Sequence, residues 1–279
     1  MTRTRPAVLA TAALALAGIL AACGGAPAAT RLDDPTAVLE AAVSNAASAG
    51  SVRIDVTADG EIAFDMTGTG NGTPISLADT TASVDADIAD GNLKATFALP
   101  GVLGLRGELI VVDDVAYVKT SLTGTQYQKT DVSGDVPDGG TGTGGSPDPS
   151  AVAEMVAGLR ETLAKPGVDP VLGADVACGS SQCYTVTINL TPEELAALGA
   201  DSGEVPLPSD LPIPVPLPEI GDQTIDLTFK VTTDTNLLAG LTAKVDGGEA
   251  GTITADLTFS AWNEDLTITA PPADQVQGG

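Results

Sequence analysis

From residue 51 onward, apolar and polar residues alternate along the chain with a period of two. Val52, Ile54 and Val56 alternate with polar neighbours, and the same pattern resumes at 62–67 after a turn at 58–61, which predicts a hairpin. A strand with this pattern buries one face and leaves the other in water. Further strands are predicted at 75–88, 93–99, 109–112, 115–120, 175–190, 225–231, 241–245, 253–259 and 266–268.

Three segments have the signatures of helices instead. The first opens at Asp34-Pro35, carries Val38, Leu39, Ala42 and Val43 on one stripe, and is expected to end at Gly50. The second spans 150–165, and the third runs from the capping box at Thr191 to about Gly199. Neither half of the chain has a complete set of covering helices. The order therefore predicts an α+β fold with a single antiparallel sheet.

Two segments interrupt the pattern of strands and helices. Residues 131–149 are rich in Gly, Asp, Ser, Thr and Pro and have no hydrophobic run to pack, so they are expected to be a mobile insert. In residues 204–219, prolines alternate with Leu, Ile and Val. Repeated proline excludes a helix or a central strand and predicts an extended rod. A stiff linker and an apolar flap beside a hydrophobic opening both remain open for this rod.

The N-terminus has the order of a secretory signal: Arg3 and Arg5, an apolar run at 7–17, and small residues before Cys23. The apolar run is shorter than the ~20 residues that span a bilayer as a helix. Leu-Ala-Ala-Cys matches the bacterial lipobox, so residues 1–22 resemble a lipoprotein signal peptide. The resemblance implies that Cys23 is lipidated and becomes the first residue.

The expected organisation of the mature chain follows from this signal. Residues 23–33 are expected to be a flexible tether, and residues 34–279 a single extracytoplasmic domain. Two acyl chains on Cys23 anchor a protein stably, whereas one chain alone binds a membrane only marginally. The expected location is therefore the extracytoplasmic side of the cell membrane.

Charge and composition exclude several classes of function. The chain has 12 Lys and Arg against 37 Asp and Glu, and removing two arginines with the signal peptide takes the net charge from −25 to −27. Such a surface is expected to be repelled by nucleic acid and by anionic headgroups. The chain has no histidine, which is the commonest general base and metal ligand. We therefore expect no nucleic-acid partner, no metal, no cofactor and no catalytic residues.

The two remaining cysteines, Cys178 and Cys183, are expected to form a disulfide in the oxidising space outside the cytoplasm. Their spacing is wider than that of thiol–disulfide enzymes. A staple across a hairpin is the preferred interpretation, and its short loop gives a stabilisation of about 2 kcal/mol.

Several local motifs together resemble the LppX/LprAFG lipoproteins of the LolA-like group. They are the lipobox, the Asp34-Pro35 helix, the Asp148-Pro149-Ser150 helix start, the Cys183-Tyr184 strand, Leu257 to Trp262, and Thr267 to Asp274. The resemblance implies a curved antiparallel half-barrel covered on its concave face by a few helices. It also implies that acyl chains lie in the apolar space between sheet and helices.

Candidate residues for this space are the apolar positions that share one phase along their strands. They are Ile54, Val56, Phe64, Met66, Ala95, Phe97, Phe229, Ala255 and Phe259. Aromatic residues make up only 3% of the chain, which leaves few bulky side chains to fill a concavity. An ordinary core filled by Ala, Val and Leu is the alternative.

The leading hypothesis is a membrane-anchored carrier that binds and shuttles lipid or glycolipid acyl chains without making or breaking bonds. Such a protein is expected to be a monomer, with a lipid exporter or another envelope protein as a possible partner. Two alternatives remain open. One is an envelope sensor or regulator on a LolA-like fold, and the other is a structural module of the cell envelope.

Overall fold

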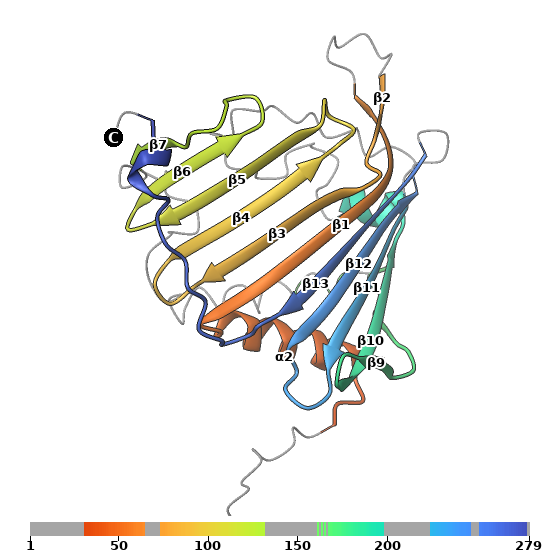
Figure 1. The fold of residues 1–279 in the computed structure, drawn as a ribbon. Coiled ribbons are helices and arrows are strands. Elements are labelled where there is room, and N and C mark those ends of the chain that lie inside the picture. Colours follow the sequence, from red (N-terminus) through yellow and green to blue (C-terminus); the bar gives the residue numbers. More distant parts are fainter. Residues whose placement is uncertain are drawn as a thin grey trace, which may run out of the picture. The chain divides into compact units, whose positions relative to one another are not determined.

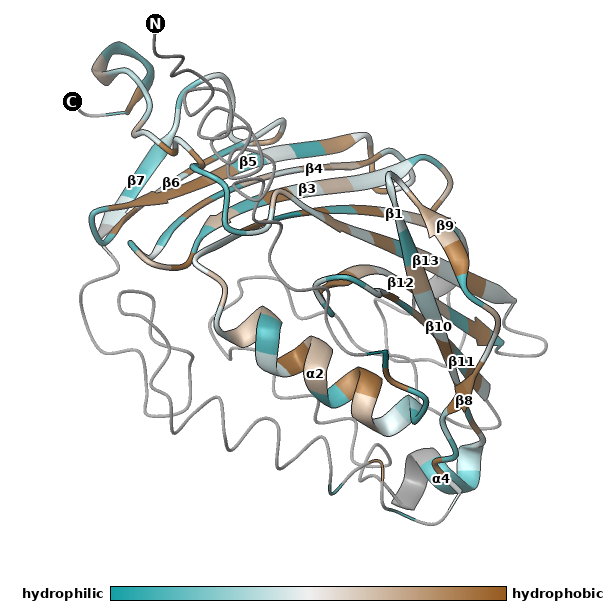
Figure 2. Cartoon of the chain, turned by 90° about the horizontal axis from the view of Figure 1, so that it is seen from below, coloured by the Kyte–Doolittle hydropathy of each residue, from teal (hydrophilic) through white to brown (hydrophobic). Residues whose placement is uncertain are grey.

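A computed structural model of the chain describes residues 31–64, 73–131, 161, 163, 165, 167–197, 224–246 and 251–277. The described residues from Leu32 onward belong to one compact unit. Within the described ranges, this unit is dominated by one antiparallel sheet, which curves around a single long helix (Figures 1 and 2).

The elements have the following bounds in the structure. The helices are α2 Pro35–Ala47 and α4 Pro192–Ala197, and a 3-10 turn, η3, spans Ala273–Gln275. The strands of the first half are β1 Ser51–Phe64, β2 Thr73–Ser76, β3 Thr80–Asp87, β4 Asn92–Leu99, β5 Leu105–Val112, β6 Val115–Thr120 and β7 Gln128–Asp131. Those of the second half are β8 Val171–Leu172, β9 Val176–Cys178, β10 Ser181–Leu190, β11 Thr224–Thr232, β12 Leu238–Asp246 and β13 Thr252–Ser260.

The pairing of β1 with β13 joins the two halves of the chain into one sheet. The strand order is β7-β6-β5-β4-β3-β1-β13-β12-β11-β10-β8, with β2 on β1 and β9 on β10. Most neighbours are consecutive hairpin strands, whereas β1 and β13 are about 200 residues apart and pair from Arg53↔Ser260 to Gly60↔Ile253. The predicted α+β class, with one open antiparallel sheet and few helices, is confirmed.

Helix α2 begins where the sequence predicts and ends earlier. The Asp34 carboxylate accepts a hydrogen bond from the Thr36 N–H at 3.0 Å, which caps the first turn. The helix ends at Ala47, three residues before the predicted stop at Gly50. Gly50 instead donates its N–H to the Asn263 side chain at 2.8 Å, so it belongs to the entry into β1.

The buried core lies where α2 packs on β10, β11 and β12. Val38, Leu39 and Ala42 point into it from the helix, as the predicted stripe requires. The other buried members of the cluster are Leu163, Val168, Tyr184, Val186, Ile188, Leu190 and Val231. Figure 2 shows α2 inside the curve of the sheet. The face that contacts α2 is therefore the concave one.

The predicted hairpin at 52–67 is wrong, because β1 is one continuous strand through the expected turn. Gly60 lies within it at φ +117°, which lets the strand bend without reversing. A Cβ at Gly60 would overlap the carbonyl oxygen of Thr252 on β13. The alternation keeps its phase across Gly60, and this continuity is the signal for a single strand.

Three other strand predictions need correction. The predicted strand at 175–190 is divided into β9 and β10 by a turn in which Gly179 has φ +63°. The predicted strand at 75–88 is divided into β2 and β3 by a turn in which Asp79 has φ +60°. No strand is present at 266–268, because the chain leaves the sheet after β13 through Ala261 and Asn263, both at positive φ. The following segment runs to the far edge, where Val276 forms a bridge with Tyr127.

The remaining predictions fall partly outside the described residues. The predicted capping box is present at α4, where Thr191 N–H donates to the Glu194 carboxylate at 2.7 Å. The segment 204–219, nearly all of the insert 131–149 and most of the predicted helix 150–165 lie outside the described ranges. Within those ranges, the helices are too short or too polar to cross a bilayer.

Candidate functional site

Cross-strand register collects the apolar residues of the sheet into rows on its concave face. Residues directly opposite each other in an antiparallel pair point to the same side. One row runs through Gly107, Phe97, Ala82, Val56, Leu257, Leu241, Phe229 and Val186. A second row runs through Val118, Leu109, Ala95, Val84, Ile54 and Phe259. Val186 belongs to the cluster beneath α2, so both rows lie on the concave side.

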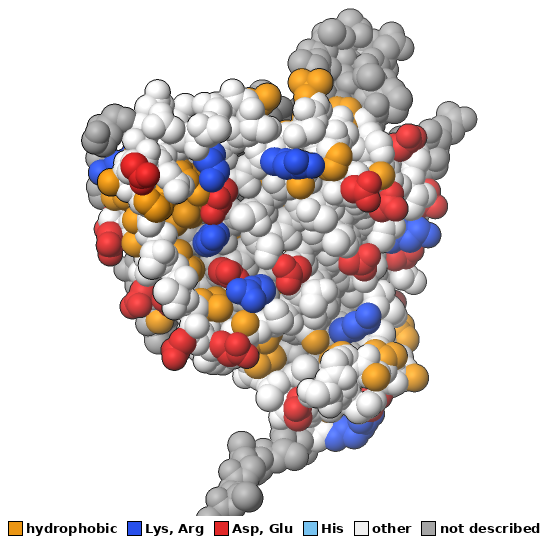
Figure 3. Space-filling view, in the orientation of Figure 1, with side chains coloured by type: hydrophobic (Ala, Val, Ile, Leu, Met, Phe, Trp, Pro, Cys, Tyr) orange, Lys and Arg blue, Asp and Glu red, His pale blue; other side chains and the backbone are white. Residues whose placement is uncertain are grey.

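The opposite face is polar on β1 and β3, whereas on β5 it also carries Ile110, which is in register with Lys94 and is buried. On β1, Arg53, Asp55 and Thr57 alternate with the concave-face residues, and Arg53 forms an ion pair with Asp85 on β3. Figure 3 shows charges of both signs spread over this outer face. On β1 and β3, the period-two pattern of the sequence therefore separates a polar outer face from an apolar inner one.

Part of the concave face lies outside the buried cluster, and we call it the apolar tract. It consists of Ile54, Val56, Ala82, Val84, Ala95, Phe97, Leu109 and Leu257. Every member is half-buried, whereas Val186 and Val231 on the α2 side of the same face are fully buried. Helix α2 makes its main contacts with β10, β11 and β12, which explains the difference.

The surface of the apolar tract combines one large ring with small neighbours. Phe97 lies against Gly107 on the adjacent strand, where a Cβ would overlap the ring. Glycine on β5 therefore makes room for the ring of Phe97. Alanines at 82 and 95 flank it, so the tract offers an apolar surface of varied depth without a charged side chain.

The structure brings together most of the residues that the sequence nominated for a cavity. Ile54, Val56, Ala95, Phe97, Phe229, Ala255 and Phe259 all lie on the concave face. Phe229 packs against the cluster beneath α2, and Phe259 stacks on Trp262 with ring centroids 6.1 Å apart. Phe64 pairs through its backbone with Thr73, while Met66 and Cys23 lie outside the described residues.

The two cysteines form the expected disulfide, and the residues around it have a structural role. It joins β9 to β10, with a Cα–Cα distance of 5.9 Å between Cys178 and Cys183. Cys183 is fully buried beside Tyr184, whose hydroxyl accepts a hydrogen bond from the Leu32 N–H at 2.9 Å. This corner therefore ties the start of the compact unit to β10.

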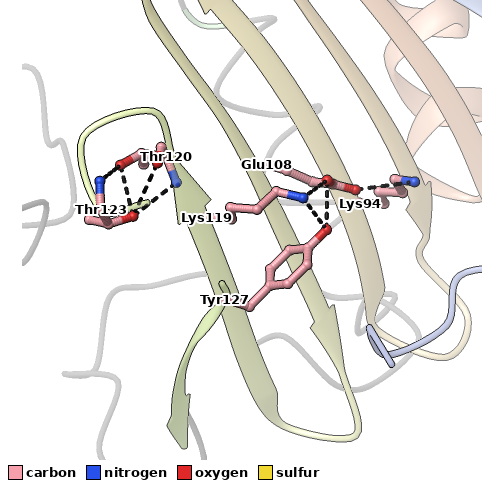
Figure 4. A network of polar contacts seen from close by, with 6 residues as sticks. All are labelled: Lys94, Glu108, Lys119, Thr120, Thr123 and Tyr127. Atoms are coloured by element: carbon pink, nitrogen blue, oxygen red, sulfur yellow. Dashed lines mark hydrogen bonds and ion pairs between the residues drawn. The ribbon is translucent and has the colours of Figure 1, made fainter. Parts of the chain in front are cut away.

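The outer face carries a polar network that the sequence did not predict (Figure 4). The Glu108 carboxylate accepts a hydrogen bond from the Tyr127 hydroxyl at 2.6 Å and lies 3.2 Å from the Lys119 amine and 3.3 Å from the Lys94 amine. Lys119 also donates to the Tyr127 hydroxyl at 3.0 Å and lies 4.2 Å from the centre of its ring. Glu108 and Lys119 are directly opposed on β5 and β6, so register was the missing signal.

The network shifts two acid–base equilibria. Partial burial pushes the pKa of Glu108 up, but hydrogen bonds from Tyr127, Lys119 and Lys94 outweigh it and hold the pKa below its usual range. The hydrogen bond with Tyr127 and the charge of Glu108 raise the pKa of Lys119, against the opposing effect of burial. Both groups therefore stay charged around neutral pH and join β5 to β6.

Elsewhere in the described ranges, there is little evidence of a polar catalytic or binding site. A depression of about 350 Å³ on the outer face is lined by threonines and by Asp59, Asp79 and Asp256. Asp59 accepts the Gly60 N–H, and Asp256 accepts the Thr242 hydroxyl. No three acids or cysteines in the described part of the chain come together as metal ligands. The apolar tract is thus the feature that a function has to explain.

Comparisons with known proteins give similarity at the level of the fold. LprF from Mycobacterium bovis is 15% identical, with 87% of this chain and 99% of LprF covered and a TM-score of 0.46. The lipoprotein LppX from Mycobacterium tuberculosis is also 15% identical, covering 84% of this chain and 98% of LppX, with a TM-score of 0.41. The chain is similar in fold to the LprF and LppX lipoproteins.

MucB is another solved structure to which the chain is similar. MucB is 15% identical over 89% of this chain and 64% of its own, with a TM-score of 0.33. No protein-family model matches the sequence, and no curated protein matches it.

Proposed function

We propose that the protein is an extracytoplasmic lipoprotein that binds acyl chains of a lipid or glycolipid against the apolar tract and shuttles them within the cell envelope. The observation that carries this proposal is the uneven covering of one continuous apolar face. On β10, next to α2, the residues of this face are buried from Tyr184 to Leu190, whereas on β3, β4, β5 and β13 and along most of β1 they are half-buried. An acyl chain is the ligand that such a surface favours.

The free energy of binding can come from methylene burial alone. Each methylene moved from water to an apolar surface contributes about 0.8 kcal/mol, so ten contribute about 8 kcal/mol before the costs of ordering. The five strands of the tract, from β5 to β13, extend over roughly 19 Å at the usual spacing between neighbours. Several methylenes of one chain therefore have room to lie across it.

The chemistry of the tract also limits what is recognised. Its members carry no charge and no hydrogen-bonding side chain, so it would select an acyl chain rather than a headgroup. Binding of this kind needs no general base, which agrees with a chain without histidine. The proposed anchor on Cys23 would hold the protein at a membrane that supplies such lipids, and an exporter or envelope protein would be its partner.

Two matched substitutions on β4 test the proposal. Ala95 lies on the concave face and Ala98 on the outer face, and both are half-buried. We expect the parent protein and Ala98→Trp to bind 11-(dansylamino)undecanoic acid in a fluorescence titration. Ala95→Trp should weaken binding at least tenfold, because the indole occupies the tract.

Thermal unfolding of the same variants separates blocking from misfolding. If the tract is open to ligand, Ala95→Trp should leave the melting temperature close to that of Ala98→Trp. In a filled core, the added volume would cost about 1–3 kcal/mol. A large fall in melting temperature for Ala95→Trp, with no probe bound by the parent, would refute the proposal.

A further inference from the structure

Two leucines are exposed to solvent at one end of the sheet. Leu103, in the turn between β4 and β5, is 92% exposed, and Leu122, between β6 and β7, is 71% exposed. The turns are neighbours, because Ser121 N–H donates to the Arg106 carbonyl at 2.8 Å and the Ser121 hydroxyl accepts the Arg106 N–H at 3.1 Å. We call residues 100–104 and 121–126 the leucine rim.

The backbone conformation that exposes Leu103 is strained. Leu103 has φ +53°, a left-handed conformation that is rare for a bulky residue, and Gly104 follows at φ +67°. A glycine or asparagine at position 103 would relieve this strain. Single exposed leucines are common on protein surfaces, but two at neighbouring turn tips form an apolar contact point. An apolar partner would offset the cost of exposing them.

Charge distinguishes the leucine rim from the turns at the opposite end of β3 to β6. Neither turn of the leucine rim contains an acid, although the chain has 37, and the exposed Arg106 lies between the turns. The acids at the same end include Asp79, in the turn before β3, and Asp59 and Glu61, on the part of β1 that extends past β3. Asp274 lies in η3, whose Gln275 carbonyl accepts the N–H of Tyr127 beside the rim. At the opposite end of β3 to β6, the chain carries Asp87, Asp90, Asp113 and Asp114. An anionic membrane surface would repel that acidic end and accept the rim.

The apolar tract continues toward the leucine rim. Leu99 and Leu105 pair directly at the ends of β4 and β5, and both share the concave-face phase of Phe97. Arg106 begins the outer-face series one residue later. An acyl chain leaving a bilayer at the rim would thus meet apolar side chains along the way to the tract.

We infer that the leucine rim is a membrane-docking surface. Leu103 and Leu122 enter the boundary between headgroups and acyl chains of a phospholipid bilayer, and Arg106 contacts lipid phosphates. The occupant is a bilayer surface rather than a second protein, because the exposed groups are two isolated apolar tips beside one cation. The purpose of docking rests on the proposed function, but docking itself does not require the tract to bind lipid.

Tryptophan reporters test this inference on the full, acylated chain. The single tryptophan, Trp262, is first replaced by phenylalanine, and Leu103→Trp or Leu122→Trp is added to that background. The matched control is Val171→Trp, since Val171 is 58% exposed on the edge strand β8. The proteins are reconstituted into vesicles of phosphatidylcholine and phosphatidylglycerol whose acyl chains are brominated.

We expect blue-shifted emission and strong quenching by bromine for both rim reporters, and neither effect for Val171→Trp. Equal quenching at all three positions, or none at the rim, would overturn the inference. A double variant, Leu103→Asp with Leu122→Asp, adds a sedimentation test. If the parent self-associates with rising concentration and this variant does not, the rim binds a second copy and the inference is wrong.

The dansyl probe keeps the two proposals distinguishable. The double aspartate variant should bind 11-(dansylamino)undecanoic acid in solution within twofold of the parent, because neither leucine belongs to the apolar tract. Normal probe binding without rim quenching would remove the docking surface and leave the carrier function standing. Rim quenching in a protein that never binds the probe would leave docking standing and remove the carrier function.

Discussion

At the scale of single residues, Glu108 shows how the outer face of the sheet is held together. It joins β4, β5 and β6 through Lys94 and Lys119, and it reaches Tyr127, which is only 4% exposed. The backbone of Tyr127 bonds in turn to Gln275 and Gln277 of the C-terminal segment. A single carboxylate therefore connects three strands to the end of the described chain.

Replacing Glu108 with glutamine should lower the free energy of unfolding by about 1–2 kcal/mol, because charged hydrogen bonds are lost at a partly exposed site. Denaturant titration measures the change. Asp113→Asn is the control, since Asp113 lies in an exposed turn at positive φ that asparagine also tolerates, and it should cost less than 0.5 kcal/mol.

The same substitution should also change how stability depends on pH. The pKa of Glu108 is lower in the folded protein than in the unfolded chain, so its stabilisation is complete above the unfolded value of about 4.3. It disappears as the pH falls through the folded pKa. The stability difference between the parent and Glu108→Gln should therefore begin to shrink as the pH falls below about 4.3 and should keep shrinking down through the folded pKa. A constant difference down to pH 3 would contradict this account of the network.

Residue patterns predicted which side chains face the core but not which of them meet. The alternation placed Ile54, Val56 and Phe97 on an apolar face, and the structure does the same. It could not place Glu108 opposite Lys119, because that contact depends on the register between two strands. Leu103 was missed for a related reason, since the sequence does not show whether a single leucine is buried or exposed.

At the scale of elements, Gly60 decides whether β1 is one strand or two. Asp-Gly between alternating runs is a strong signal for a hairpin, yet here the glycine makes a bend against β13. The Asp-Gly pair alone does not distinguish these outcomes, because the contact that fixes the bend is the Thr252 carbonyl nearly 200 residues away. The unbroken alternation across Gly60 was the local signal that favoured one strand. The disulfide hairpin and the capped start of α4 depend on local contacts, and both were predictable.

Gly60→Ala should therefore destabilise the protein by at least ~2 kcal/mol, because left-handed strain adds to an overlap with the backbone of β13. Gly104→Ala is the matched control. Gly104 also has positive φ, but no atom lies within 4 Å of the added methyl group, so it should cost only about 1 kcal/mol. Equal midpoints of Gly60→Ala and Gly104→Ala in thermal unfolding would show that the bend in β1 is not packed against β13 as described.

At the scale of the whole molecule, one apolar face serves two purposes. Near β10 and β11 it forms a sealed core with α2, and near β1, β3 and β4 it forms the apolar tract. The sequence predicted a single sheet and a shortage of covering helices, which is the physical origin of this division. It could not predict that β1 pairs with β13, since alternation says nothing of a strand's neighbours.

The lipobox gives a prediction at the same scale. Cys23→Ala should release the exported protein from membranes, because the acylated thiol is the proposed anchor. Fractionation followed by high-salt and carbonate washing measures the release, with Cys178→Ser as the control that leaves the lipobox intact. Retention of the Cys23→Ala protein in the washed membranes would show that another anchor operates.

The central claim, that the apolar tract holds an acyl chain, is tested most directly by native mass spectrometry of the full chain from an exporting host. The account predicts a noncovalent lipid on the parent, in addition to any mass attached to Cys23, that organic solvent removes. The lipid should persist in Ala98→Trp and be absent from Ala95→Trp. A parent protein that carries only its covalent modifications, in every preparation from lipid-rich membranes, would contradict the account.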